Sequence, residues 1–220
     1  MFKHSLTLFA SLFILMCCQA QHTPVYMPLG DSYTIGEGLK ANERFPDQLV
    51  ELLARDSRKV VLGPNPSQTG WTSLQLIEEE LPLFHKTKPE YATLLIGVND
   101  WVQGVPAGDF RKQFRTIVKD IIQVLPAKKN LVVLTIPDFS ATPEGAKYGR
   151  GRNISAGIDE FNRIIIEECN ALGITVVDIC PETRKMKSDP SLISADGLHP
   201  SAKEYAIWAK MVLPYFQKMN

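Results

Sequence analysis

The chain has 220 residues, and 45% of them are hydrophobic, so it is long enough to bury one sizeable core. Lysine and arginine together number 24, as do aspartate and glutamate, and this balance argues against the basic surface that binds nucleic acid or an anionic membrane. No composition shift, repeat or low-complexity segment divides the chain. We therefore expect one domain with no nucleic-acid partner, and its substrate need not be charged.

The N-terminal segment differs in composition from the rest. Lys3 provides a short basic start, residues 6–18 form an apolar run, and the letters that end at Ala20 (CQA) resemble the small-residue site where a signal peptidase cleaves. The run is about 13 residues long, whereas a membrane-spanning helix needs roughly 20. We interpret 1–20 as a signal peptide and expect a single mature domain over 21–220, without a transmembrane span, exported to the periplasm or the cell exterior.

The cysteines raise two further questions. Cys17 or Cys18 would be the acylated residue of a bacterial lipoprotein, an alternative that Met16 disfavours because such sites prefer a small residue there. An exported chain also invites a disulfide between Cys169 and Cys180. Cys169 falls near the end of a helical stretch and Cys180 at the far end of the next strand, about 20 Å away. We expect two free, buried thiols and no zinc site, because neither has a histidine at ligand spacing.

Beyond the signal segment, short apolar strands alternate with amphipathic helices, which is typical of a parallel sheet covered by helices on both faces. The sequence predicts a three-layer α/β/α sandwich with five parallel strands, over 25–29, 59–62, 91–96, 131–136 and 174–179. The predicted helices cover 45–55, 110–125, 154–171 and 201–216, and another begins at Thr72 or Ser73. In that helix we expect three residues to face the core, namely Leu74, Ile77 and Leu81.

Small and polar residues follow the first strand abruptly, in the segment from Leu29 to Gly36 (LGDSYTIG). Gly30 and Gly36 permit backbone torsions that a side chain would forbid, so we expect Ser32 to be exposed on a tight turn with its own N–H pointing outward. A serine in that position is a candidate nucleophile. In isolation the same letters are more typical of a turn that Asp31 and Ser32 merely cap.

Three further motifs decide between these interpretations. They are TGW at 69–71, GVND at 97–100 and DGLHP at 196–200. With the serine segment, they follow strands one, two, three and five, and the carboxyl ends of parallel strands share the edge of a sheet where ligands bind. Chance would scatter such motifs between both edges, so the common edge favours one catalytic site. The remaining acids of these motifs, Asp31 and Asp100, are expected to bind loop backbone.

Together the four motifs resemble the pattern of the SGNH (GDSL) hydrolase family, and they span nearly the whole mature chain. The resemblance implies a flavodoxin-like strand order, 2-1-3-4-5, and an esterase that needs no cofactor. It implies that Ser32 is the nucleophile and that Asp196 and His199 complete the catalytic set. It also implies an oxyanion hole formed by Ser32, Gly70 and Asn99. We assign no residue to a metal.

The chemistry of these groups agrees with the assignment. Ser32 Oγ would attack an ester carbonyl, and neutral His199 would take the proton and return it to the leaving alcohol. Asp196 lies close enough in the chain to hold the imidazole in the required tautomer. The backbone N–H groups of Ser32 and Gly70 and the side-chain amide of Asn99 would stabilise the oxyanion.

Residues beside this edge are expected to contact the substrate. Five are candidates to line an acyl or sugar pocket, namely Trp71, Trp101, Val102, Phe139 and Tyr148. A long polar loop over 138–152 would either contact a phosphate or carboxylate of the substrate or form a solvated lid, and its candidate residues are Lys147, Arg150 and Arg152. The substrates that the family resemblance implies are acetylated polysaccharide, lysophospholipid or a short acyl ester, and thioesters remain an alternative.

Two other classes of function stay open. A non-catalytic carbohydrate- or lipid-binding module would have the same fold, although such a module is expected to have lost at least one of the motif residues. A flavodoxin-like cofactor binder would carry a bound chromophore. An α/β-hydrolase fold is disfavoured because Ser32 lacks the G-x-S-x-G context, and the segment after the first strand carries neither a P-loop nor a dinucleotide fingerprint. An exported serine esterase is the interpretation that we test against the structure.

Overall fold

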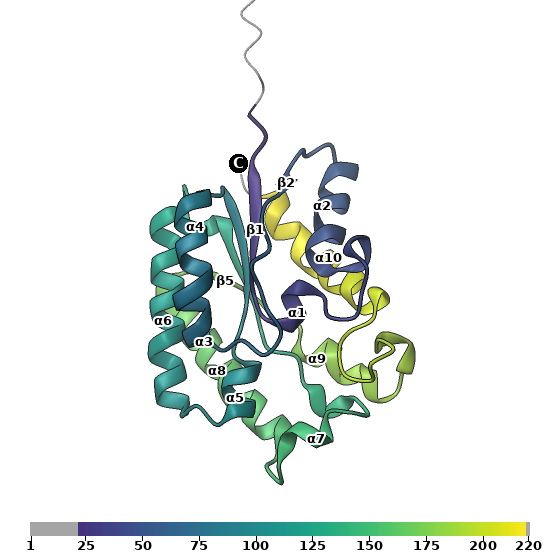
Figure 1. Ribbon diagram of the computed structural model, residues 1–220. Helices are drawn as coiled ribbons and strands as arrows, with labels where there is room; N and C mark the ends of the chain where they lie inside the picture. The colour runs from purple at the N-terminus through teal and green to yellow at the C-terminus, as the bar shows by residue number, and fades with distance from the viewer. Residues whose placement is uncertain (1–21, 219–220) are drawn as a thin grey trace, which may run out of the picture.

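Five parallel strands form the centre of the structure, a computed structural model that describes residues 22–218 (Figure 1). The strands are β1 (Val25–Gly30), β2 (Val61–Leu62), β3 (Tyr91–Leu95), β4 (Leu131–Leu134) and β5 (Thr175–Val177). Their order in the sheet is β2-β1-β3-β4-β5, which confirms the predicted fold class and strand order. The signal peptide expected over 1–20, with Cys17 and Cys18, lies outside the described residues.

The pairing of β1 with β3 aligns the ends of these two strands. Their register runs from Tyr26 opposite Tyr91 to Gly30 opposite Leu95. Every residue of β3 is buried, which explains its continuous apolar sequence, because helices cover both faces of the sheet. The segments that follow β1 and β3 therefore leave the sheet side by side, at its carboxyl edge.

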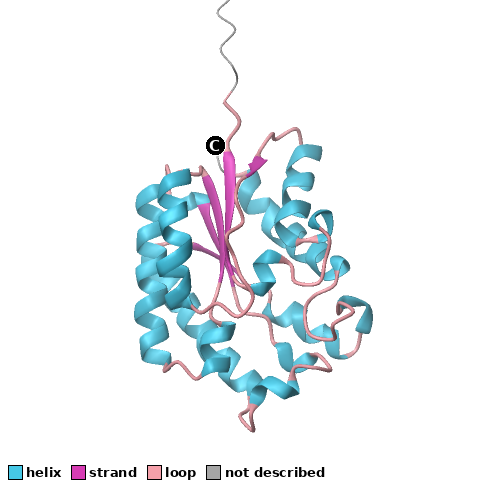
Figure 2. Cartoon of the chain, viewed as in Figure 1, coloured by secondary structure: helices cyan, strands magenta, loops and turns pink. Residues whose placement is uncertain are grey.

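Helices form a layer on each face of the sheet (Figures 1 and 2). On one face α2 (Phe45–Arg55) packs against α10 (Ala202–Gln217). The other face carries α4 (Leu81–Thr87), α6 (Ala107–Val124) and α8 (Ile154–Leu172). The ends of α8 are set by a capping side chain and by a glycine. Asn153 accepts the Ala156 N–H at 3.1 Å at its start, and Gly173 ends it in the left-handed conformation.

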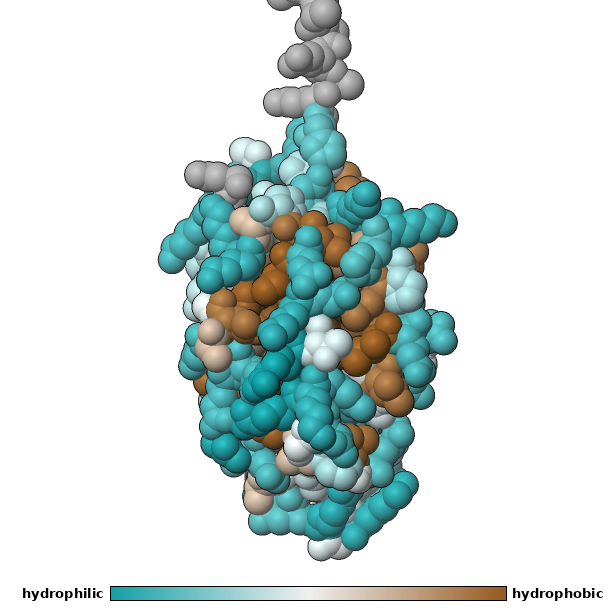
Figure 3. All heavy atoms as spheres, turned by 90° about the vertical axis from the view of Figure 1, so that its left-hand side faces the viewer, coloured by the Kyte–Doolittle hydropathy of each residue, from teal (hydrophilic) through white to brown (hydrophobic). Residues whose placement is uncertain are grey.

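Ion pairs join the outer surfaces of α6 and α8. Arg111 donates to Glu167 at 2.5 Å and to Glu168 at 2.7 Å, and Arg115 donates to Glu168 at 2.6 Å. The hydrogen bond from Arg115 is the main cause that lowers the pKa of Glu168, although burial of that carboxyl acts in the opposite direction. On the face turned toward the viewer in Figure 3, hydrophilic side chains run between two apolar areas.

The helical segment between β2 and β3 contains an irregular turn. It consists of α3 (Ser73–Gln75), a π-helical turn (Leu76–Glu80) and α4. Thr72 caps its start, since the Thr72 N–H and Oγ1 both donate to Gln75 Oε1, at 2.7 and 2.8 Å. Pro82 has no N–H to continue the α-helical ladder, and the wider turn directly before it accommodates this loss.

The buried face of this segment differs from the expected one. Leu76 and Glu80 are fully buried, whereas Leu74 is 47% exposed. The expectation that Leu74 faces the core is therefore wrong. Ser73, Leu76 and Glu80 form the buried face of this segment, and Leu74 lies beside that face, toward solvent.

The two described cysteines are free and buried, as predicted. Burial raises the pKa of the Cys169 thiol to about 12 and that of the Cys180 thiol to about 11, so both stay protonated at neutral pH. Within 22–218, no helix combines the length and the apolar character needed to cross a membrane.

Candidate active site

Ser32 lies at the carboxyl edge of the sheet, as the first residue of the short helix α1 (Ser32–Ile35) directly after β1. Asp31 caps this helix, because its Oδ1 accepts the Tyr33 N–H at 3.0 Å. The tight approach of the chain requires glycine at position 30. A Cβ there would lie 2.2 Å from the Leu95 carbonyl oxygen, and φ is +154°. Asp31 binds loop backbone as expected, but Ser32 is only 5% exposed, because the walls of a pocket surround it.

Three side chains from two distant segments form a continuous hydrogen-bonded relay. His199 Nε2 lies 2.9 Å from Ser32 Oγ, and His199 Nδ1 lies 2.7 Å from Asp196 Oδ2. Asp196 and His199 belong to the loop directly before α10, and this loop lies beside the end of β1. The structure thus brings together the serine, histidine and aspartate that the motifs predicted, in the order that proton transfer requires.

The surroundings of Asp196 keep this carboxyl ionised. Its Oδ1 accepts hydrogen bonds from Ser194 Oγ at 2.6 Å, from the Leu198 N–H at 2.8 Å and from the His199 N–H at 2.9 Å. Partial burial acts to raise the pKa of Asp196, but these donors outweigh it and lower the pKa to about 2. An ionised Asp196 accepts the Nδ1–H of the imidazole, which leaves His199 Nε2 as the acceptor for the Ser32 hydroxyl proton.

Two groups that can stabilise an oxyanion line the same pocket as Ser32, one from helix α5 (Val98–Gln103) and one from the loop after β2. Asn99 lies in the first turn of α5, and its Nδ2 donates to the Trp71 carbonyl oxygen at 2.9 Å. Gln103 Nε2, from the same helix, donates to the Gly70 carbonyl oxygen at 3.0 Å. Helix α5 therefore fixes both the Asn99 amide and the Gly70 backbone, and both residues line the same pocket as Ser32.

Asp100 connects helix α5, which carries Asn99, to Ser73. Its carboxylate is fully buried and accepts the Ser73 N–H at 2.9 Å and the Ser73 hydroxyl at 2.5 Å. Burial raises the pKa of Asp100, and the two hydrogen bonds from Ser73 counteract the rise. Asp100 thus joins α5 to the start of α3, which agrees with its expected role as a ligand of loop backbone.

A small pocket opens in front of the relay. Its volume is about 140 Å³. Its walls are mainly apolar, and it is lined by Ser32, Tyr33, Thr69, Gly70, Val98, Asn99, Val102, Phe139, Tyr148, Leu198 and His199. Pockets for drug-sized ligands measure roughly 300 to 1,000 Å³, so this pocket suits a much smaller group.

Three of the five residues expected in the substrate pocket line it. Val102, Phe139 and Tyr148 do, whereas Trp71 and Trp101 are absent from its walls. Trp101 is 6% exposed, its ring packs 5.8 Å from that of Phe139, and the Arg152 guanidinium lies 4.0 Å from its ring centroid. Trp101 therefore supports the wall from behind, and Trp71 contributes its carbonyl oxygen to hold Asn99.

Several wall residues lie inside the motifs themselves and were not singled out from the sequence. Tyr33 follows the serine, Val98 precedes the asparagine and Leu198 precedes the histidine. Their positions beside the reacting groups are the signal that would have identified them. Thr69 has no such signal beyond its place next to Gly70.

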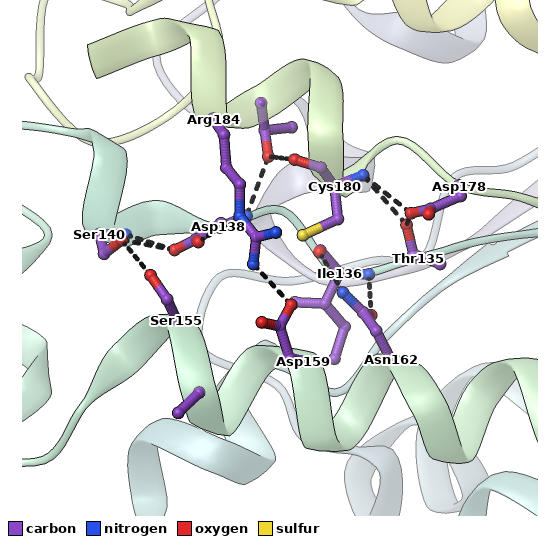
Figure 4. A network of polar contacts seen from close by, with 12 residues as sticks. Thr135, Ile136, Asp138, Ser140, Ser155, Asp159, Asn162, Asp178, Cys180 and Arg184 are labelled. Atoms are coloured by element: carbon purple, nitrogen blue, oxygen red, sulfur yellow. Dashed lines mark hydrogen bonds and ion pairs between the residues drawn. The ribbon is translucent and has the colours of Figure 1, made fainter.

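A polar network joins Asp138 to Arg184 and to Ser140, the residue on the other side of Phe139 in the chain (Figure 4). Asp138, 1% exposed, accepts the Ser140 N–H at 3.1 Å and the Arg184 Nε–H at 2.8 Å. Arg184 also donates to Asp159 of α8 at 2.5 Å. Burial would raise the pKa of Asp138, but the hydrogen bonds from Ser140 and Arg184 lower it. The Asp138 carboxylate, whose charge Arg184 balances, therefore fixes the backbone next to Phe139 through its bond to the Ser140 N–H.

The loop over 138–152 is partly ordered by its own contacts. It contains the short helix α7 (Ala146–Gly149), and Tyr148 on this helix is 43% exposed at the rim of the pocket. Arg152 donates to the carbonyl oxygens of Trp101 and Val102, at 2.7 and 2.9 Å. Lys147 pairs with Glu144. Arg152 thus serves the packing of the loop against α5, and Tyr148 is the residue of the loop that reaches the pocket.

No set of three or more His, Cys, Asp and Glu side chains within the described part of the chain is arranged to hold a metal ion.

Comparisons with known proteins agree with the fold and the motifs. The model of the GDSL-like Lipase/Acylhydrolase family matches residues 29–207. The crystal structure of TesA has a TM-score of 0.69 at 20% identity, with 89% of this chain and 99% of that chain covered. The lipase/acylhydrolase from Enterococcus faecalis has a TM-score of 0.72 at 18% identity, with 89% and 96% covered.

The acetylxylan esterase Axe2 from Geobacillus stearothermophilus is also similar, with a TM-score of 0.69 at 17% identity and with 87% and 93% of the two chains covered. No curated protein sequence matches the chain. At these identities the solved structures show a shared fold, whereas the family model covers most of the sequence, including all four motifs. The chain therefore belongs to the GDSL-like lipase/acylhydrolase family and is a carboxylic ester hydrolase.

Proposed function

We propose that the protein is an exported serine esterase that removes a short acyl group from an alcohol oxygen through an acyl-enzyme on Ser32. The observation that carries the proposal is the relay from Ser32 Oγ through His199 to Asp196, with distances of 2.9 and 2.7 Å, in front of a pocket of about 140 Å³. The export of the protein rests on the composition of residues 1–20.

The acylation step follows from the positions of these groups. Ser32 Oγ attacks the ester carbonyl carbon while its proton passes to His199 Nε2. The negative charge that develops on the carbonyl oxygen is stabilised by the Ser32 and Gly70 N–H groups and by the Asn99 amide. His199 then returns the proton to the leaving alcohol oxygen as the carbon–oxygen bond breaks. The acyl group stays on Ser32, and the alcohol departs.

Deacylation uses the same groups with water in place of the alcohol. His199 Nε2 takes a proton from water, whose oxygen attacks the acyl carbon, and the oxyanion is stabilised as before. The bond to Ser32 Oγ then breaks, and His199 returns the proton to the serine. Asp196 stays ionised throughout, because its pKa lies at about 2.

The size of the pocket supports a short acyl chain. A buried apolar cavity of about 150 Å³ holds a benzene molecule, which has six heavy atoms. The pocket beside Ser32, at about 140 Å³, is of the same size and therefore suits acetyl to butyryl groups. Among the substrate classes implied by the motifs, a short acyl ester such as an acetylated carbohydrate fits better than a lysophospholipid. Axe2, named an acetylxylan esterase, has the same fold.

The test compares three p-nitrophenyl esters, the acetate, the butyrate and the octanoate, on the chain over 21–220 and on its Ser32→Ala variant. We expect the parent to hydrolyse acetate and butyrate, with kcat/KM for octanoate lower by roughly tenfold or more. The variant should be inactive on all three. Equal activity of parent and variant would exclude Ser32 as the nucleophile. Inactivity of both would favour the non-catalytic binding module, and a preference for octanoate would contradict the short acyl pocket.

A further inference from the structure

A buried carboxyl lies beneath the turn that carries Ser32, and no part of the proposed mechanism uses it. Glu80 is fully buried, and its Oε2 accepts the Gly30 N–H at 3.0 Å. Its other oxygen, Oε1, has no hydrogen-bond partner among the described residues. A buried carboxyl that keeps one oxygen unpaired reduces the stability of the fold, and an apolar side chain of similar size would avoid this cost.

The helix that carries Glu80 is irregular at this residue. Glu80 ends the π-helical turn, and the neighbouring acids of the same turn, Glu78 and Glu79, are exposed. Of these three acids only Glu80 is buried, and it contacts the end of β1 through the Gly30 N–H. Single π turns of this kind occur frequently at functional sites.

The peptide that Glu80 binds is the last one before the nucleophile turn. Gly30 has φ at +154°, and its N–H lies two residues before Ser32. The orientation of this peptide sets the direction in which the chain leaves β1. Ser32 Oγ must stay 2.9 Å from His199 Nε2, and a displacement of about 1 Å at a reacting group reduces the rate by roughly 100-fold.

We propose that Glu80 is a positioning residue, whose hydrogen bond to the Gly30 N–H holds the turn that carries Ser32 in the reactive geometry. This inference rests on the proposed role of Ser32 as the nucleophile. Glu80 accepts the Gly30 N–H through Oε2, and burial raises the pKa of this carboxyl well above the usual range of a glutamate. Glutamine at position 80 offers the same carbonyl acceptor, whereas leucine or methionine offers none.

The test measures how fast an alkyl fluorophosphonate inactivates the protein, because this rate reports the reactivity of Ser32 without a deacylation step. The variants are Glu80→Leu, Glu80→Met and Glu80→Gln. Glu79→Leu is the matched control on the same turn, and Ser32→Ala shows the unspecific background. We expect Glu80→Leu and Glu80→Met to react roughly 10- to 100-fold more slowly, with unchanged KM for p-nitrophenyl acetate and an unchanged or raised Tm. Glu80→Gln should restore the rate to within about threefold of the parent.

Each outcome separates this inference from the proposed function. Folded Glu80→Leu and Glu80→Met variants that react at the parent rate would overturn the positioning role. Glu80→Gln reacting as slowly as Glu80→Leu would also overturn it, because the acceptor is then not the cause. If neither apolar variant folds, Glu80 acts in folding and the inference fails. Labelling of Ser32→Ala at the parent rate would instead refute the nucleophile itself.

Discussion

The amide of Asn99 is the most informative single group in the site, and we develop its removal in Asn99→Ala. One of its two N–H groups donates to the Trp71 carbonyl oxygen at 2.9 Å, which fixes the orientation of the amide. The other N–H is then available to an oxyanion in the pocket, which Asn99 lines together with Ser32 and Gly70. Loss of one preorganised oxyanion donor lowers kcat by about 10²- to 10³-fold, equivalent to roughly 3 to 4 kcal/mol.

Steady-state kinetics on p-nitrophenyl acetate distinguish this role from a structural one. We expect kcat of Asn99→Ala to fall by about 10²- to 10³-fold while KM changes little, because the donor binds the oxyanion and not the ground-state ester. Gln103→Ala is the matched control on α5, since it loses a bond to the Gly70 carbonyl oxygen but no proposed oxyanion donor. It should lose less than about tenfold in kcat. An unchanged kcat in Asn99→Ala would refute the assignment of this amide to the oxyanion hole.

Three further predictions follow from buried contacts. Arg184→Met leaves the Asp138 carboxylate without its ion-pair partner, which should loosen the pocket wall. The ratio of kcat/KM for octanoate to that for acetate should then rise several-fold. An unchanged ratio would show that the Arg184–Asp138 pair does not control acyl-chain specificity. Gly30→Ala brings a Cβ to 2.2 Å from a carbonyl oxygen, whereas Gly104→Ala, at φ +82°, meets no atom within 4 Å. In urea unfolding, Gly104→Ala should cost about 1 to 2 kcal/mol and Gly30→Ala several times more, and equal losses would contradict the packing at Gly30. Burial raises the pKa of Asp31 to about 8, so the folded chain retains a proton that the unfolded chain releases above about pH 4. The free energy of unfolding should therefore fall as pH rises from about 4 to 8, less steeply in Asp31→Asn, and identical slopes would contradict this origin.

The sequence was sufficient for the parts of the site that are local. Ser32 follows a strand, and Asp196 lies three residues before His199, so their placement needs only the parallel sheet and the shared edge of its strands. The strand order itself came from the family resemblance. Periodicity alone cannot choose between the orders that a five-stranded parallel sheet allows.

The parts that the sequence did not reveal depend on tertiary contacts. Apolar spacing places Leu74 in the core, but the buried face of this segment runs through Ser73, Leu76 and Glu80, and two of these residues are polar. Trp101 was expected in the pocket because aromatic residues beside an active edge often bind substrate, but Arg152 and Phe139 cover it. The sequence gives no signal that distinguishes Glu80 from other acids on a helix, because its contact with the Gly30 N–H is tertiary.

The most direct measurement of the central claim is the mass of the protein after reaction with diethyl p-nitrophenyl phosphate, followed by peptide mapping. We predict a single diethylphosphoryl group on Ser32, complete loss of esterase activity, and no adduct in the Ser32→Ala variant. His199→Ala should form the same adduct far more slowly, since the serine then lacks its base. An adduct on another residue, or an active protein with Ser32 fully modified, would contradict the account.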